Sequence, residues 1–135
     1  MKPLVLNRNK NGYKKQNRLI NYKLLLAGLG LFLLGQVLAW YQTNGQFISE
    51  WVKEHPILVA AIGGVPVGYS YILATTLTVQ AFNGEVWPSR LLGFSMGIMA
   101  FTILTLIHLN EGLTFKTIVT LCLATLIVLL QVLWK

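Results

Sequence analysis

The chain has 135 residues, of which 55% are hydrophobic and only 11% are charged. A soluble domain carries about a quarter charged residues, so this composition excludes an ordinary soluble protein and favours one embedded in a membrane. Lysine and arginine number 11 against 4 aspartate and glutamate, which gives a formal net charge of +7.

A basic segment opens the chain, with seven lysines and arginines and no acidic residue in residues 1–23. Positive residues beside membrane spans stay on the cytoplasmic side. We therefore predict that residues 1–23 form a basic cytoplasmic tail that anchors the orientation. Binding of this tail to nucleic acid or to anionic lipid is the alternative. We expect the anchor, with no nucleic-acid partner.

Four apolar segments follow, at residues 24–41, 57–82, 89–109 and 115–134, with no acidic residue in any interior. A helix needs about 20 apolar residues to cross the hydrocarbon core of a bilayer. The sequence therefore predicts an all-α membrane protein in which residues 24–135 form a compact bundle of four transmembrane helices. Aromatic residues at the segment ends predict an interfacial belt. They are Trp40, Tyr41, Trp51, Trp87 and Trp134.

Charge predicts the orientation of this bundle. With four spans, nine basic residues share the side of the termini, and only Lys53 and Lys116 lie on the other side. We expect an integral protein of the cell (inner) membrane with both termini cytoplasmic. Alternatively, the first apolar segment is a signal peptide cleaved after Ala39, because a basic stretch and an apolar run precede "VLA".

Small residues spaced four apart recur in three of the apolar segments. In a bilayer, helices associate by close packing, and such pairs let two backbones approach. Gly64 and Gly68 form one pair with this spacing, in the second segment. The helix-packing residues predicted in the other segments are Gly35, Ala39, Gly93, Gly97 and Ala100.

The stretch "GGVPVGYSY", residues 63–71, is rich in helix-weakening groups. Pro66 lacks an N–H and leaves the Ile62 carbonyl without its helical partner. In lipid, an unsatisfied carbonyl costs several kcal/mol. A static kink and a hinge that lines a substrate path both stay open. The kink or hinge residues are Gly63, Gly64, Pro66 and Gly68.

Gln36 is the strongly polar side chain well inside the first segment. Counted from the outer ends of their segments, Gln36 and Ile62 both lie about 8 Å deep at 1.5 Å per residue. We therefore predict that the Gln36 amide donates to the Ile62 carbonyl. Tyr69 and Tyr71 lie near the middle of their segment, where their hydroxyls need partners or a polar cavity.

Four short-looped spans, together with "LGQVLAWYQTNGQF", "HPILVAAIGG", "WPSRLLGFSMGIMAF" and "NEGLT", resemble the small multidrug resistance family of the drug/metabolite transporter superfamily. Gln36 stands where the essential membrane glutamate of that family would fall, and Met96 lies near the place of a mid-helix aromatic. The resemblance implies a dimer that moves small organic cations, guanidinium compounds or other small molecules by alternating access. Since glutamine releases no proton, we expect no proton coupling at this position. The substrate-lining candidates are Gln36, Tyr69, Tyr71 and Met96.

The chain carries no P-loop, HExxH, CxxC or GxGxxG motif and no paired carboxylates. We therefore expect no enzyme, no metal site and no cofactor. Two functions stay open. One is a transporter-like protein that moves or flips a small solute as a homodimer, or as a heterodimer with a similar small membrane protein. The other is a non-transporting assembly, accessory or holin-like module whose helices only pack.

Overall fold

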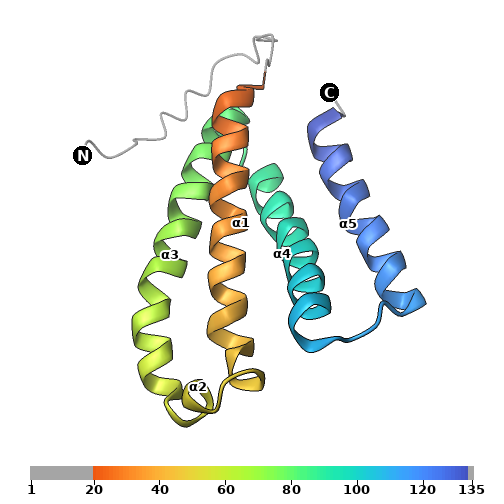
Figure 1. Ribbon diagram of the computed structural model, residues 1–135. Helices are drawn as coiled ribbons and strands as arrows, with labels where there is room; N and C mark the ends of the chain where they lie inside the picture. The colour runs from red at the N-terminus through yellow and green to blue at the C-terminus, as the bar shows by residue number, and fades with distance from the viewer. Residues whose placement is uncertain (1–19, 134–135) are drawn as a thin grey trace, which may run out of the picture.

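The computed structural model describes residues 20–133, apart from the side chains of residues 131 and 132, and it contains no strand in that range (Figure 1). The predicted all-α fold is confirmed. The tail predicted for residues 1–23 lies almost wholly outside the described residues. The helices are α1 Tyr22–Asn44, η1 Gly45–Phe47, α2 Glu50–Glu54, α3 Pro56–Ala81, α4 Val86–Leu109 and α5 Phe115–Leu133.

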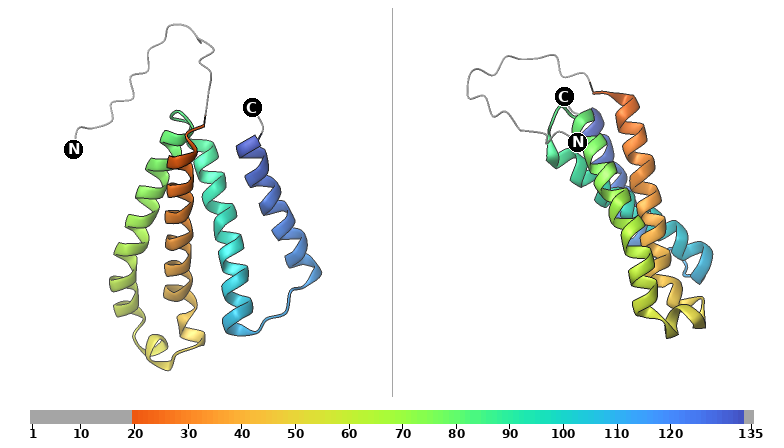
Figure 2. Two further views of the ribbon diagram at one scale, coloured as in Figure 1. Left: turned by 45° about the horizontal axis from the view of Figure 1, so that its top comes forward. Right: turned by 90° about the vertical axis from the view of Figure 1, so that its left-hand side faces the viewer.

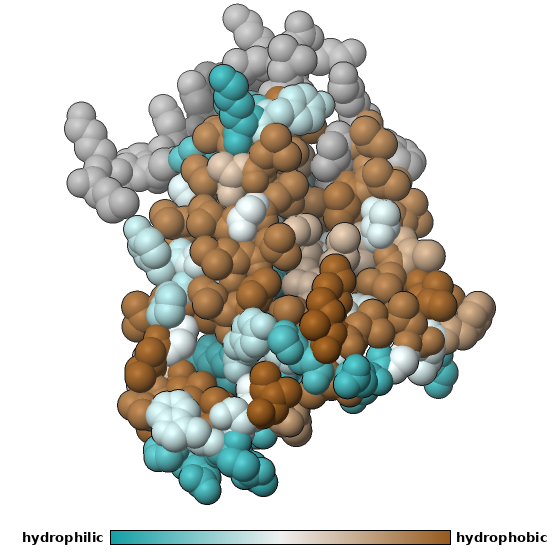
Figure 3. All heavy atoms as spheres, viewed as in Figure 1, coloured by the Kyte–Doolittle hydropathy of each residue, from teal (hydrophilic) through white to brown (hydrophobic). Residues whose placement is uncertain are grey.

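Three helices are long and apolar enough to cross a membrane. They are α1 with its short extension η1, at 26 residues, α3 at 26 residues and α4 at 24 residues. Without η1, the ends of α1, α3 and α4 lie within three residues of the ends predicted for the first three apolar segments. Apolar side chains cover most of the middle of the bundle (Figure 3). In α5 the apolar stretch Phe115–Leu130 is shorter, so the fourth crossing stays a prediction.

The long helices run up and down in chain order, and α1 lies between α3 and α4 (Figures 1 and 2). α5 lies beside α4 and packs mainly on that helix. Among the described side chains of α5, only Ala124 is fully buried. The molecule is therefore a closely packed trio of helices with a fourth helix attached at its side.

The α1–α3 interface is close because two glycines of α1 face α3. A Cβ added to Gly28 would lie 2.5 Å from Thr78 Cγ2 and 3.2 Å from the Ala74 carbonyl oxygen. One added to Gly35 would lie 3.3 Å from Ser70 Cβ. These glycines let the two backbones approach to a distance that a larger residue would prevent.

A small apolar cluster closes the end of the bundle where α1 begins. Close to it, the hydroxyls of Thr78 on α3 and Ser89 on α4 lie 2.6 Å apart and are fully buried. This bond satisfies both polar groups within the apolar interior. The buried members of the cluster are Leu25, Ala81, Phe82 and Leu92.

Left-handed residues turn the chain at the ends of α3 and α4. Asn83 and Gly84 have φ angles of 56° and 94°, and Asn110 has a φ of 52°. Asparagine and glycine adopt this conformation at least strain. After Asn110, residues 111–114 carry the chain away from α4 before α5 starts. This connection sets the position of α5 relative to the trio.

Candidate functional site

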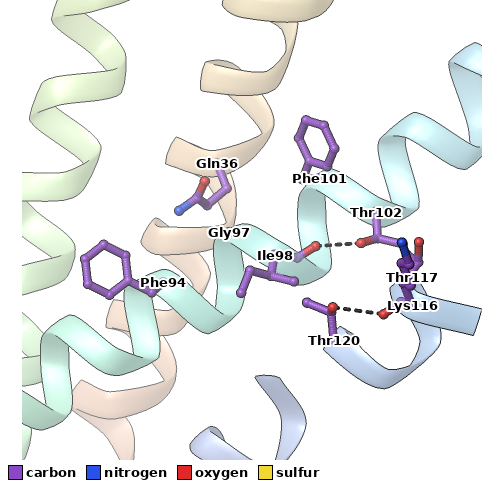
Figure 4. A pocket seen from close by; sticks show the side chains of 9 residues that line it. All are labelled: Gln36, Phe94, Gly97, Ile98, Phe101, Thr102, Lys116, Thr117 and Thr120. Carbon is purple, nitrogen blue, oxygen red and sulfur yellow. Dashed lines mark hydrogen bonds between the residues drawn. The ribbon is translucent and has the colours of Figure 1, made fainter. Parts of the chain in front are cut away.

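A cavity of about 550 Å³ lies between α1, α4 and α5, close to the α4–α5 connection (Figure 4). It combines polar side chains from all three helices with aromatic and aliphatic walls from α4. The residues that line it are Gln36 from α1, Phe94, Gly97, Ile98, Phe101 and Thr102 from α4, and Lys116, Thr117 and Thr120 from α5.

Gln36 ties α1 to α4 at the wall of this cavity. Its Nε2 donates to the Gly93 carbonyl oxygen at 3.2 Å. Its amide lies directly over Gly97, where an added Cβ would stand 2.7 Å from Nε2. The absence of a side chain at Gly97 therefore makes room for the glutamine head.

The predicted hydrogen bond from Gln36 to the Ile62 carbonyl is wrong. The neighbouring Gly35 packs on Ser70, so Gln36 lies about two helical turns away from Ile62 along α3. The prediction ended α1 at residue 41, whereas the helix continues to Asn44. It also set the outer ends of the two segments level, whereas Gln42, near the end of α1, lies beside Gly63, well inside α3.

Gln42 is the glutamine that meets the glycine-rich part of α3. Its Nε2 donates to the Ala60 carbonyl oxygen at 3.2 Å. Its side chain also covers Gly63, where an added Cβ would lie 3.1 Å from Gln42 Cδ. Gln36 and Gln42 thus make equivalent bonds to backbone carbonyls of two different helices, and only Gln36 lines the cavity.

Two of the three threonines of the cavity, Thr102 and Thr120, already use their hydroxyl hydrogens. Thr102 Oγ1 donates to the Ile98 carbonyl oxygen and Thr120 Oγ1 to that of Lys116, each at 2.9 Å. Thr117 Oγ1 shares a hydrogen bond of 2.9 Å with Thr114 Oγ1. A hydroxyl has one hydrogen and two lone pairs, so Thr102 and Thr120 can still accept from a ligand.

The apolar wall of the cavity belongs to α4. Phe94 is 64% exposed and Phe101 is 52% exposed, while Ile98 is 36% exposed. All three lie on the surface of an apolar helix (Figure 4). Exposed apolar side chains therefore border the open side of the cavity.

Three of the four predicted substrate-lining residues do not line the cavity. Tyr71 packs on the α1–α3 side, with its ring centroid 6.3 Å from that of Phe32. Tyr69 is 62% exposed on α3, and Met96 is half-buried on α4. The structure therefore brings Gln36 alone of the four into the cavity.

The predicted kink or hinge also lies outside the cavity. α3 continues as one helix through Pro66, which is exposed. Ser70 Oγ donates to the Pro66 carbonyl oxygen at 2.8 Å. Gly64 meets only the Gln42 amide at 3.9 Å, and an added Cβ at Gly68 would meet nothing within 4 Å. Gly64, Pro66 and Gly68 therefore face outward, whereas Gly63 packs against Gln42.

Three of the predicted packing residues, Gly35, Gly93 and Gly97, lie at interfaces within the chain. A Cβ added to Gly93 would stand 3.1 Å from the Phe32 ring. In the same way, Gly97 contacts Gln36, and Gly35 contacts α3. Ala100 is buried and Ala39 is half-buried. The Gly93–Gly97 pair therefore packs against α1 of the same molecule.

A second polar group joins α1 to α4 farther along the helices. Trp40 Nε1 donates to Thr105 Oγ1 at 3.1 Å, and Tyr41 Oη lies 2.7 Å from His108 Nε2. Trp40 is 3% exposed, so its predicted place in the interfacial belt is wrong, and its indole instead holds two helices together. Trp87, at 78% exposed, is free of such packing.

Sequence reasoning missed the cavity members from α4 and α5. A weak signal was present, since Lys116, Thr117 and Thr120 interrupt the apolar character at the start of the last segment. Residues this far apart in sequence share a cavity only through the angle between α4 and α5. Among residues 20–133 no three metal-ligating side chains gather.

Fold and site together define a helical membrane protein with a partly polar cavity beside exposed apolar side chains of α4. No known protein family, no curated protein and no solved structure matches the chain.

Proposed function

We propose that the protein is a four-span membrane protein that moves or flips a small solute, with no proton coupling at Gln36. The cavity between α1, α4 and α5 carries this proposal. It offers a polar amide, hydroxyl acceptors and one ammonium group within an apolar bundle. Polar groups at membrane depth are expensive to bury, and for that reason they commonly mark solute pathways.

Gln36 supports the proposal because its bond to Gly93 leaves an amide group at the cavity wall. A residue that served packing alone would not need to border an open space. The alternative function, a non-transporting assembly module, draws on the open face of α3 at Gly68. That face does not gather an amide, hydroxyls and an ammonium group as the cavity does, and we rank this function second.

The test is solute flux in proteoliposomes for Gln36→Leu and its matched control Gln42→Leu. Both variants lose one interhelical bond to a backbone carbonyl, and such bonds are worth up to about 1.7 kcal/mol. We expect Gln36→Leu to lower flux about tenfold and Gln42→Leu to leave it nearly unchanged. Probes are tetraphenylphosphonium, guanidinium, glycerol 3-phosphate and fluorescent phospholipids. Equal fluxes for both variants, or no flux of any probe, would reject the proposal.

Uncoupled movement has its own test. An imposed pH gradient should not drive accumulation, because the glutamine amide stays neutral and neither gains nor loses a net proton over the accessible pH range. Gln36→Glu should introduce a dependence of flux on pH. Accumulation by the natural chain against a concentration gradient, driven by protons and lost in Gln36→Leu, would contradict this part.

The proposal includes an orientation, with both termini cytoplasmic and α5 as the fourth crossing. Reporter tags fused before Met1 and after Lys135 should both report the cytoplasm. Tags on opposite sides would mean that α5 does not cross. A mature N-terminus at Trp40 would instead establish cleavage of the first segment. We propose a homodimer, or a heterodimer with a similar small protein, as the working unit.

A further inference from the structure

We infer that the cavity binds an anionic lipid whose headgroup carries hydroxyls, with its phosphate at Lys116, its hydroxyls at the threonine and glutamine oxygens, and its chains along Phe94 and Phe101. This inference rests on the proposed function, because it names the substrate class of the same cavity.

The charge of the cavity favours an anion. Lys116 is the one charged residue that lines it, and no carboxylate is among the lining residues. Within the described part of the chain, the Lys116 ammonium makes no ion pair. The cavity also lies at the start of α5, where the helix dipole is positive. Two like charges at one site repel, so an organic cation fits this cavity poorly.

The hydroxyl and amide groups favour a ligand that donates hydrogen bonds. Thr102 and Thr120 spend their hydrogens on backbone carbonyls and present lone pairs. Gln36 Nε2 spends one of its two hydrogens on Gly93, which leaves one N–H and the side-chain oxygen, an acceptor, at the cavity wall. Phosphate oxygens cannot donate to these acceptors, whereas hydroxyls of a glycerol or sugar headgroup can. A simple phosphate ester therefore satisfies only part of the cavity.

The apolar wall favours a lipid over a free phosphate. Phe94 and Phe101 are more than half exposed on the outer surface of α4, beside the polar lining (Figure 4). In a bilayer these rings contact acyl chains, and a soluble phosphate would gain nothing from them. One ligand that joins an anion, hydroxyls and chains meets all three parts of the cavity.

The experiment measures lipid binding to delipidated full-length protein in detergent, by native mass spectrometry and by thermal stability. The probes are phosphatidylglycerol, phosphatidic acid, phosphatidylcholine and soluble glycerol 3-phosphate. Binding to the folded state raises its stability by an amount that grows with the ligand concentration relative to the Kd. We expect phosphatidylglycerol to bind most tightly, phosphatidic acid less tightly and phosphatidylcholine least. Glycerol 3-phosphate should compete weakly, and equal binding of this soluble probe would overturn the assignment to a lipid.

Matched variants locate the binding. Lys116→Gln should weaken phosphatidylglycerol binding about tenfold, the size of one charge-assisted bond. Lys53→Gln is the control, since Lys53 lies at the same end of the molecule on α2 and outside the cavity. Thr120→Val should weaken it less, and Thr125→Val not at all, although Thr125 makes the same bond to its own helix. Equal effects within either pair would overturn the inference.

The outcomes separate this inference from the proposed function. Binding of tetraphenylphosphonium that depends on Gln36, with no preference for phosphatidylglycerol, would overturn the lipid class and leave transport standing. Selective binding of phosphatidylglycerol without lipid movement in proteoliposomes would support the binding site and reject transport. Absence of binding by every probe would overturn the inference.

Discussion

Two glycine pairs with the same spacing have different surroundings in this molecule. Gly93 and Gly97 on α4 face the Phe32 ring and the Gln36 amide of α1. Gly64 and Gly68 on α3 face outward, and Gly68 has nothing within 4 Å of an added Cβ. One pair packs against a neighbouring helix of the same chain and the other is left open.

The difference shows that the spacing of small residues permits close approach without choosing a partner. The neighbour decides, and here it supplies a ring over Gly93 and an amide over Gly97. The same contrast holds on α1 itself, where Gly28 packs tightly on α3 and Gly30 has open space. Alanine at each of these positions therefore measures the neighbour, because the helix propensity change is the same.

The largest effect is expected for Gly28→Ala. The new methyl would lie 2.5 Å from Thr78 Cγ2 and 3.2 Å from a backbone oxygen. Thr78 cannot yield easily because it is fully buried and its hydroxyl bonds Ser89. We expect the free energy of unfolding to fall by about 1–3 kcal/mol, as overpacking in a close-packed interior does.

Gly30→Ala on the same helix is the control for this variant, and its stability should equal or exceed that of the natural chain. Unfolding in bicelles or mild detergent gives both values. Similar stabilities for the two variants would mean that α1 and α3 are farther apart than described.

A smaller effect is expected for Gly97→Ala. The added methyl meets the far end of Gln36, which can move aside by giving up its bond to Gly93. The loss should be about 1 kcal/mol, within the range of interhelical bonds in membranes. In a Gln36→Ala background the same change should be nearly neutral. Strict additivity of the two changes in a double-mutant cycle would contradict the contact.

The coupling between Thr78 and Ser89 is also an interhelical hydrogen bond, and its expected energy is smaller than the loss expected for Gly97→Ala. Their hydroxyls lie 2.6 Å apart between α3 and α4. We expect a coupling energy of about 0.6 kcal/mol from Thr78→Val and Ser89→Ala, because measured interhelical bonds average that value. Thr125→Val, which alters a bond within one exposed helix, should show no coupling to Ser89→Ala.

The extent of the long helices could be predicted from the sequence, since the apolar length that a bilayer requires dominates every other signal. The end of α1 could not. Thr43 and Asn44 are typical of loops, but their side chains bond the Ala39 and Trp40 carbonyl oxygens and continue the helix. Such residues bond nearby backbone groups in either setting. This extension accounts for part of the separation between Gln36 and Ile62, and the rest arises because α3 extends past the end of α1, where Gln42 lies beside Gly63.

The cavity could be predicted only at Gln36. Its other polar members come from α4 and α5. The connection after Asn110 holds the start of α5 away from α4, and this leaves the space that these residues line. Tyr69 and Tyr71 were candidates because their hydroxyls need polar partners. Whether each side chain faces the bundle or its outer surface depends on how α3 packs on α1. Interhelical register and angle are set by packing, and a single sequence does not contain them in readable form.

The smallest effect on folding is expected for Gly68→Leu, the counterpart of the packed glycines. Nothing lies within 4 Å of the added Cβ, and the neighbouring Val65 and Ile72 are 75% and 65% exposed. A leucine here would point toward lipid, so the free energy of unfolding should change by no more than about 0.5 kcal/mol. The measurement pairs unfolding with the oligomeric state in nanodiscs.

A large loss of folding stability in Gly68→Leu would mean that α3 packs on another part of its own chain. Unchanged stability together with a shift from dimer to monomer would place a second copy on the open face of α3, because leucine blocks the close approach that glycine allows. Unchanged stability and an unchanged oligomeric state would mean that this face contacts lipid. In the last two outcomes, only the Gly93–Gly97 pair contributes to the fold of the single chain. The oligomeric state then decides whether the Gly64–Gly68 pair contributes to assembly.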